Sequence, residues 1–413
     1  MSSGGNAQPG LGAAAATHAA IAHIFREEAG RLTGALVRLL GDFDEAEDLV
    51  QEALLAALEH WPREGIPARP GAWLMTAARR KAIDRWRRRA HCEELLSRIT
   101  VEPGVAPREP DERLRLIFTC CHPALAREAQ LALTLRAVLG LTTAEIARAF
   151  LSNEATIAQR IVRAKRKIVE AHIPYRMPEA GDLTARLDEV LRVLYLLFNE
   201  GYLSTGGAAA VRRDLAEDAE WLTALLACLL SNQPEVVGLL VLIRLHRARD
   251  RARFGQDGRL VLLQHQDRSL WDRAVIADAI SLLEHASRMG RPGPYQVQAA
   301  ILACHAEAPS WEATDWAQIL ALYDVLARFD PSPVIALNRA IALRYVAGPA
   351  TALATVDTLT AALDRYHLFH ATRAELLRAL GRVAEAREAN LRAIALTANP
   401  AERMLLQQRI GLH

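Results

Sequence analysis

An all-α protein is indicated by three features of the sequence. Aromatic residues make up only 5% of the chain, whereas alanine, leucine and arginine, which favour helices, are abundant. Alternating strand patterns and hairpin turns such as Asn-Gly are scarce. Apolar residues recur instead at intervals of three and four over long stretches. Because 413 residues exceed what one core usually holds, two or three helical domains are expected.

The net charge and the cysteines limit the function classes. The formal net charge is only +2, so any nucleic-acid binding must come from local basic patches. Five cysteines without a regular spacing indicate a reducing compartment. The first residues lack a secretory pattern and no apolar run reaches membrane-spanning length, so we expect a cytoplasmic protein with no membrane partner.

Enzyme and metal-site motifs are not evident. We find no phosphate-binding Gly-Lys-Ser/Thr loop, no His-Glu-x-x-His helix and no Gly-x-Ser-x-Gly turn, so we expect no enzyme and no cofactor.

A zinc site is suggested by Cys120, Cys121 and His122, with His91 and Cys92 upstream. Adjacent cysteines on a helix point about 100° apart, which favours buried thiols over a metal site.

The first helices follow a tail. Residues 1–17 are rich in Gly and Ala and are predicted to be a disordered tail. A helix is expected from His18 to Leu40, where Gly41 ends it. The next helix is predicted to open at Asp44, with Glu47 completing a capping box.

This second helix also has an acidic face opposite its apolar stripe. Glu45, Asp48 and Glu52 lie on that face, with Gln51 at its edge. Such a face indicates a protein partner of opposite charge. Helix capping and solvation are the alternative, and for Glu45 and Glu47 they explain the charge equally well.

A basic helix over Ala72–Arg89 is the most distinctive stretch. A loop over Pro62–Gly71, with three prolines and two glycines, precedes it. Leu74, Ala78, Ala82 and Trp86 recur every four residues and form a packing side. The other sides carry Arg79, Arg80, Lys81, Arg85, Arg87, Arg88 and Arg89. Because guanidinium groups bind phosphate and stack on bases, the helix suits DNA beside unpaired nucleotides; a solvated charged helix is the alternative.

A second helical domain is predicted over residues 111–175, after a proline-containing linker over 91–110. Thr142 and Glu145 form a capping box, and Ser152 is expected to cap the following helix. That helix has apolar residues on one side and basic residues around the rest. Two short helices with the second one basic predict a helix-turn-helix. Arg160 and Arg163 are candidates for guanine contacts, and Gln159 for adenine.

These residues carry a resemblance. The stretch from Asp44 to Arg89 resembles region 2 of RNA polymerase sigma factors of the extracytoplasmic-function (ECF) type, which implies a domain over 18–90. The resemblance implies that the acidic helix binds core RNA polymerase, at the clamp helices of its largest subunit, through Asp44, Glu47, Asp48, Leu49, Gln51 and Glu52. It also implies that the basic helix melts and reads the −10 promoter element through Arg79, Arg80, Lys81, Asp84, Arg85, Arg87 and Arg88.

The helix-turn-helix is similar to sigma region 4. This implies contacts with the flap of the second-largest polymerase subunit and recognition of the −35 promoter element. The implied DNA-binding residues are Thr156, Gln159, Arg160, Arg163, Lys165 and Arg166. Ala155 and Ala158 stand where the family usually has Gly and often a basic residue, so the motif is carried over to this helix and the family's base preference is not.

The half from Leu183 onward exceeds a minimal sigma factor. The stretch His370–Pro400 has tetratricopeptide-like (TPR-like) spacing, and Ala336–Leu359, with Gly348 in the turn, echoes it. We therefore predict a TPR-like α-solenoid over 183–413 that regulates the factor and holds a protein or peptide ligand. The polar segments Phe198–Tyr202 and Gln266–Asp272 either contact the sigma domains, form a signal site, or cap and pair helices.

The predicted function is promoter-specific initiation with core RNA polymerase on promoter DNA. The alternative is a helix-turn-helix regulator that recruits a partner through the TPR-like domain without replacing a sigma factor.

Overall fold

The computed structural model describes residues 10–88, 112–150, 152–202, 209–255, 259–397 and 400–411. In these ranges the chain is helical and contains no β-strand; Phe254 and Leu260 form one isolated bridge. The chain divides into two compact units, residues 1–197 and 198–413. The prediction of an all-α protein is confirmed. In the described ranges, no helix is long and apolar enough to cross a membrane.

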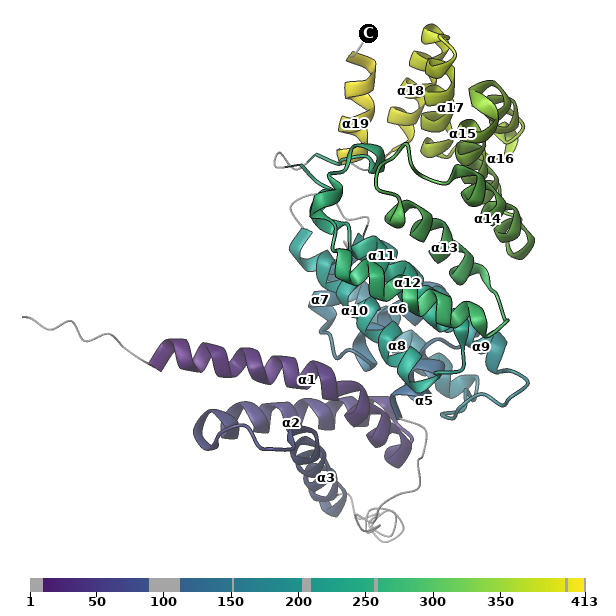
Figure 1. Ribbon diagram of the computed structural model, residues 1–413. Coiled ribbons are helices and arrows are strands. Elements are labelled where there is room, and N and C mark those ends of the chain that lie inside the picture. The colour runs from purple at the N-terminus through teal and green to yellow at the C-terminus, as the bar shows by residue number, and fades with distance from the viewer. Residues whose placement is uncertain are drawn as a thin grey trace, which may run out of the picture. The chain divides into compact units, whose positions relative to one another are not determined.

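Three helices make the first half of unit 1: α1 (Gly10–Leu40), α2 (Phe43–Glu64) and α3 (Pro70–Arg88), which contact one another (Figure 1). Their apolar stripes form the core, with Leu36, Leu49 and Leu74 at most 1% exposed. The order and type of these helices are as the apolar periodicity predicts.

Three boundaries differ from the prediction. Helix α1 begins at Gly10 and not at His18, because the alanines of the expected tail favour helix. Helix α2 is capped by Asp42, whose Oδ1 accepts hydrogen bonds from the amides of Asp44 and Glu45, so Asp44 lies inside the helix. Pro62 is also inside α2, and the predicted loop shrinks to residues 65–69. The predicted linker, residues 91–110, lies outside the described residues.

The second half of unit 1 contains α5 (Glu112–Cys120), α6 (Arg127–Ala137), α7 (Thr143–Ala149) and α8 (Glu154–Glu170). The capping box of Thr142 and Glu145 at α7 is confirmed. The cap of α8 is Asn153 and not Ser152, because the Asn153 side chain accepts from the amide of Thr156. Helices α7 and α8 pack together as a helix-turn-helix.

The cysteine segment is buried in this half. Cys120 and Cys121 are 0% exposed, and the hydroxyl of Thr134 lies 3.5 Å from the Cys121 thiol. Burial raises the pKa of Cys121 to about 12, so the thiol stays protonated at neutral pH. Among the described residues, no group of three or more His, Cys, Asp or Glu side chains is arranged to hold a metal ion.

Helix α9 (Leu183–Tyr202) spans the boundary of the two units. The first helices of unit 2 are α10 (Ala209–Leu229), α11 (Pro234–Arg247), α12 (Arg273–Arg288) and α13 (Pro294–Glu307). The 3-10 turns η1 (Asp250–Ala252), η2 (Leu263–His265) and η3 (Arg268–Leu270) lie between α11 and α12. Asp267 and Asp272 cap η3 and α12 through the amides of Ser269 and Val275, which favours the capping interpretation of this polar segment.

The remaining helices are α14 (Trp316–Phe329), α15 (Pro333–Asp357), α16 (Thr360–Leu363), α17 (His367–Ala379), α18 (Val383–Leu396) and α19 (Pro400–Gly411). Gly348 (φ 85°) breaks α15 into two helical arms, and Gly381 (φ 73°) turns the chain between α17 and α18. Both glycines adopt the left-handed region that other residues avoid. The predicted turn at Gly348 is therefore where the chain reverses.

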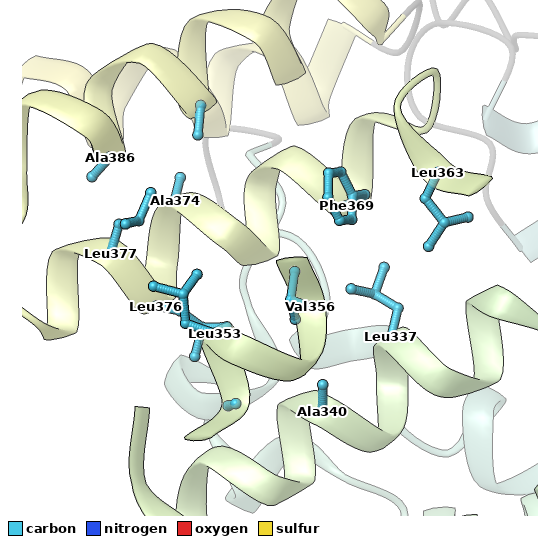
Figure 2. Close-up of a cluster of buried hydrophobic side chains, with 12 residues drawn as sticks. Leu337, Ala340, Leu353, Val356, Leu363, Phe369, Ala374, Leu376, Leu377 and Ala386 are labelled. Carbon is cyan, nitrogen blue, oxygen red and sulfur yellow. The ribbon is translucent and has the colours of Figure 1, made fainter. Parts of the chain in front are cut away.

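One apolar core joins α15, α16, α17 and α18. Figure 2 shows Leu337 and Val356 of α15 beside Phe369 and Leu377 of α17, with Ala386 of α18. These side chains are at most 1% exposed. The repeat-like spacing thus corresponds to helix pairs that bury their apolar faces against the next pair.

Candidate nucleic-acid interface

The basic surface of α3 lies opposite its packing side. Leu74, Ala78 and Ala82 are buried against α1 and α2, and Trp73 meets Trp61 edge-to-face with ring centroids 5.4 Å apart. The exposed side carries three cationic residues in a row, Arg79, Arg80 and Lys81. Packing therefore orients these side chains toward solvent. The predicted contact residues Asp84, Arg85, Arg87 and Arg88 continue α3, and their side chains, with that of Trp86, lie outside the described residues.

Helix α8 presents a second basic surface. Ile157, Ile161, Ala164 and Ile168 are buried at helical spacing, which turns the other sides outward. Gln159, Arg163 and Arg166 are exposed, while Thr156 and Arg160 are half-buried. The α8 N-terminus thus offers polar side chains together with the positive end of the helix dipole, as a recognition helix requires.

Lys165 is the exception on this helix. It is only 9% exposed, and its Nζ lies 2.7 Å from Oδ1 of Asp44 and 3.1 Å from Oε1 of Glu47. Arg136 donates from Nε to Oε2 of Glu47 at 3.0 Å. The acidic residues at the start of α2 therefore pair with the helix-turn-helix half of unit 1.

Close backbone approach accompanies these ion pairs. A Cβ atom placed on Gly30 of α1 would lie 2.7 Å from the carbonyl oxygen of Val138. A Cβ atom on Gly140, whose φ is 71°, would lie 2.9 Å from Cβ of Ala29. Arg38 adds an ion pair to Glu112 at 3.0 Å. The two halves of unit 1 are thus packed against each other along α1 and the start of α2.

The other residues of the acidic helix have different environments. Asp48 is exposed, and Gln51 and Glu52 are half-buried. Leu49 is 0% exposed, so it belongs to the core in this arrangement. Asp48 and Glu52, one helical turn apart, are the acidic residues of the predicted polymerase-binding set that lie outside the Lys165 ion pairs.

Comparisons with known proteins match both helical halves of unit 1. Residues 24–92 match sigma-70 region 2, and residues 115–168 match sigma-70 region 4. The ECF RNA polymerase sigma factor SigL of Mycobacterium tuberculosis (strain ATCC 25618 / H37Rv) is 34% identical over 162 residues, which cover 91% of SigL and 38% of this chain. The chain belongs to the ECF family of RNA polymerase sigma factors.

Other relatives extend the comparison. The ECF sigma factor SigK of Mycobacterium bovis (strain BCG / Pasteur 1173P2) is 29% identical over 163 residues, covering 84% of SigK and 36% of this chain. An uncharacterized protein of Rhizobium meliloti (strain 1021) is 45% identical over 388 residues, covering 92% of that protein and 91% of this sigma factor. Residues 186–287 match a family of unknown function, DUF6596. No match was found among solved structures.

The family assignment establishes the activity. This sigma factor acts with RNA polymerase and promoter DNA in promoter-specific transcription initiation, and it is not an enzyme. The alternative, a helix-turn-helix regulator that recruits a partner, is therefore wrong. A regulator that does not replace a sigma factor would not need region 2.

Sequence reasoning missed Arg136 and the pairing of Lys165 with α2. Arg136 lies in a helix with no basic cluster, so its spacing gave no signal. The opposite charges of the acidic α2 face and of α8 were consistent with such a pairing. Charge alone did not distinguish a partner protein from another part of the same chain.

Proposed function

We propose that the surfaces of unit 1 divide the work of initiation. Helix α2 binds the clamp helices of the largest polymerase subunit through Asp44, Glu47, Asp48, Gln51 and Glu52, with Leu49 supporting the helix from the core. Helix α3 and the loop over 65–69 open and read the −10 element. Helix α8 reads the −35 element beside the flap of the second-largest subunit. The exposed row Arg79–Lys81 beside the acidic helix is the observation that best supports this division. The site of action is the cytoplasm, where polymerase meets the promoter.

The extension after Leu197 is proposed to regulate this activity. SigL matches only 38% of the chain, so sigma relatives exist without the extension. The extension has its own buried core and forms a separate compact unit, as a regulatory or docking domain would. Its helix pairs, with turns at Gly348 and Gly381, support a TPR-like arrangement.

Truncation tests this regulatory role. A chain ending at Leu197 keeps the ion pair of Glu189 with Arg127 and the hydrogen bond from Arg186 to the Phe118 carbonyl, which hold α9 to unit 1. We expect its run-off transcription with core polymerase to differ from that of the full chain by at least about 5-fold, the range of regulatory couplings. Equal activity at equal concentration would contradict a regulatory role.

The ion pairs of Lys165 are proposed to hold the free factor closed. The same carboxylates of Asp44 and Glu47 cannot pair with Lys165 and with polymerase at once. The side chains of Lys165 and Glu47 are only 10% and 13% exposed, so water screens this pair less than a surface pair. Binding of polymerase would therefore require the two halves of unit 1 to separate.

Charge reversal at Lys165 should open this contact. In Lys165→Glu, three carboxylates would meet, and repulsion should favour separated halves. If only a minor fraction of free factor is open, apparent affinity for core polymerase without DNA should rise roughly 10-fold. Titration with labelled core polymerase measures this, and small-angle scattering measures the opening.

Lys167→Glu is the matched control, since Lys167 is exposed on the same helix and the change in charge is equal. Unchanged or weaker polymerase binding by Lys165→Glu, relative to Lys167→Glu, would count against the closed form.

A further inference from the structure

Unit 2 contains a cavity of about 420 Å³. It is lined by Leu260, by residues 262–264, by Trp311, and by side chains of α15, α17 and α19. All of these belong to the extension. The volume lies within the range of about 300–1,000 Å³ that small-molecule sites occupy. The cavity is therefore large enough for an organic ligand.

An aromatic wall forms one part of the cavity. Tyr345 stacks on Trp316 with ring centroids 3.9 Å apart, and Trp311 meets Tyr345 edge-on at 5.7 Å. His305 stacks on Trp311. Burial lowers the pKa of His305 to about 4, so its imidazole is neutral. Although these rings are held in place, Tyr345 remains 37% exposed. Leu368, also in the lining, is 42% exposed.

The uncovered apolar surface of Tyr345 and Leu368 has a physical cost. Apolar area left in water forgoes the stabilisation that its burial would give. Contiguous apolar surface in a concave site is typical of ligand sites. Since the aromatic wall is already rigid, a ligand that covers it would lose little binding free energy to ordering the protein.

Two guanidinium groups in the lining share one carboxylate. Arg344 and Arg409 lie 3.3 Å and 3.7 Å from the oxygens of Glu375, which also pairs with Arg378 at 2.8 Å. The side chains of Arg344 and Arg409 are only 24% and 21% exposed. Burial, together with the neighbouring Arg378 and Arg344, lowers the pKa of Arg409. This part of the wall thus carries more positive than negative charge.

The other lining carboxylate already has partners. Glu402 lies 2.9 Å from Nε2 of His367 and accepts a hydrogen bond from the hydroxyl of Thr397 at 2.7 Å. Its partner His367 lies eight positions, or about 12 Å, along α17 from Glu375, so this carboxylate is remote from the guanidinium groups around Glu375. An incoming acid group would meet Arg344 and Arg409, whose planar donors suit carboxylate, sulfonate or phosphate oxygens.

We propose that this cavity binds a small organic anion, with its acid group on Arg344 and Arg409 and its apolar body against Tyr345 and Leu368. A peptide fits less well. Each residue of an extended peptide brings a backbone donor and acceptor, whereas Gln264 and Thr372 are the lining side chains with an uncharged amide or aliphatic hydroxyl.

Two fluorescent probes test the proposal on the full chain. 1-Anilinonaphthalene-8-sulfonate has aromatic rings and a sulfonate; N-phenyl-1-naphthylamine has the same rings without the acid group. We expect saturable binding of one anionic probe per chain. Arg344→Gln should weaken the anionic probe at least about 10-fold, because charge-assisted hydrogen bonds are lost. It should change the neutral probe less than about 2-fold, because apolar contacts remain.

Further variants locate the site. Ala371→Trp places an indole in the cavity and should abolish binding of both probes. Arg387→Gln is the control, since Arg387 is exposed on α18 and outside the lining. Thermal unfolding of each variant checks its fold, and Arg409→Gln replaces Arg344→Gln if the latter is unfolded.

Several outcomes would overturn the proposal: no saturable binding of the anionic probe, unchanged binding in Ala371→Trp, or equal losses of both probes in Arg344→Gln. Because the readout is binding and not transcription, these outcomes leave the proposed sigma roles unaffected.

Discussion

Reversal of the charges of Asp48 and Glu52 together, as Asp48→Lys with Glu52→Lys, is expected to lower the affinity for core polymerase at least about 100-fold. Both residues lie on one side of α2, one turn apart, outside the ion pairs of Lys165. Loss of a hydrogen-bonded interfacial charge pair typically costs about 2–5 kcal/mol, and reversal adds repulsion. Run-off transcription should fall with binding, since a sigma factor initiates transcription together with polymerase.

The control for this variant is Glu59→Lys, an exposed position farther along α2 and beyond the predicted motif. Binding of labelled core polymerase is measured first, and transcription second. If Glu59→Lys weakens binding as much as the double variant, the effect is one of overall charge, and Asp48 and Glu52 do not form the contact.

Removal of the basic row of α3, by Arg79→Ala with Arg80→Ala, is expected to reduce initiation on duplex promoter about 100-fold. Guanidinium groups stack on unpaired bases and bind the backbone beside them, so they stabilise the open state more than the duplex. On a promoter already unpaired at the −10 element, the loss should be about 10-fold smaller, because stacking and phosphate contacts no longer have to offset base opening.

Arg26→Ala is the matched control for α3, because Arg26 is an exposed arginine of α1 in the same half of unit 1. Run-off transcription on the two templates is the measurement. Equal losses on both would mean that Arg79 and Arg80 only hold backbone phosphate and take no part in opening.

Local chemistry explains where sequence reasoning succeeded and where it failed by a few residues. The capping box of Thr142 and Glu145 was predicted correctly because it depends on side chains three positions apart. Two other caps were assigned to a neighbouring polar residue: Asp42 and Asn153 cap their helices in place of Asp44 and Ser152. Several residues in each stretch can accept from a helix amide, and only the backbone conformation decides which one does.

The sequence by itself determined the helical architecture, the order of the two sigma regions, and the basic and acidic faces of α3 and α2. The architecture and the two charged faces follow from the period of the apolar residues, which acts within one helix. The order of the sigma regions is implied by the resemblance of the two motifs to the family. The tertiary structure decided which charges meet. Lys165 and Asp44 are 121 positions apart, and packing of α1 against the helix-turn-helix half brings them to 2.7 Å.

The cavity of the extension was likewise decided by tertiary structure, since its lining comes from segments between residues 260 and 409. Contacts between distant segments depend on how whole helices pack, and the spacing of residues within a helix does not contain that information.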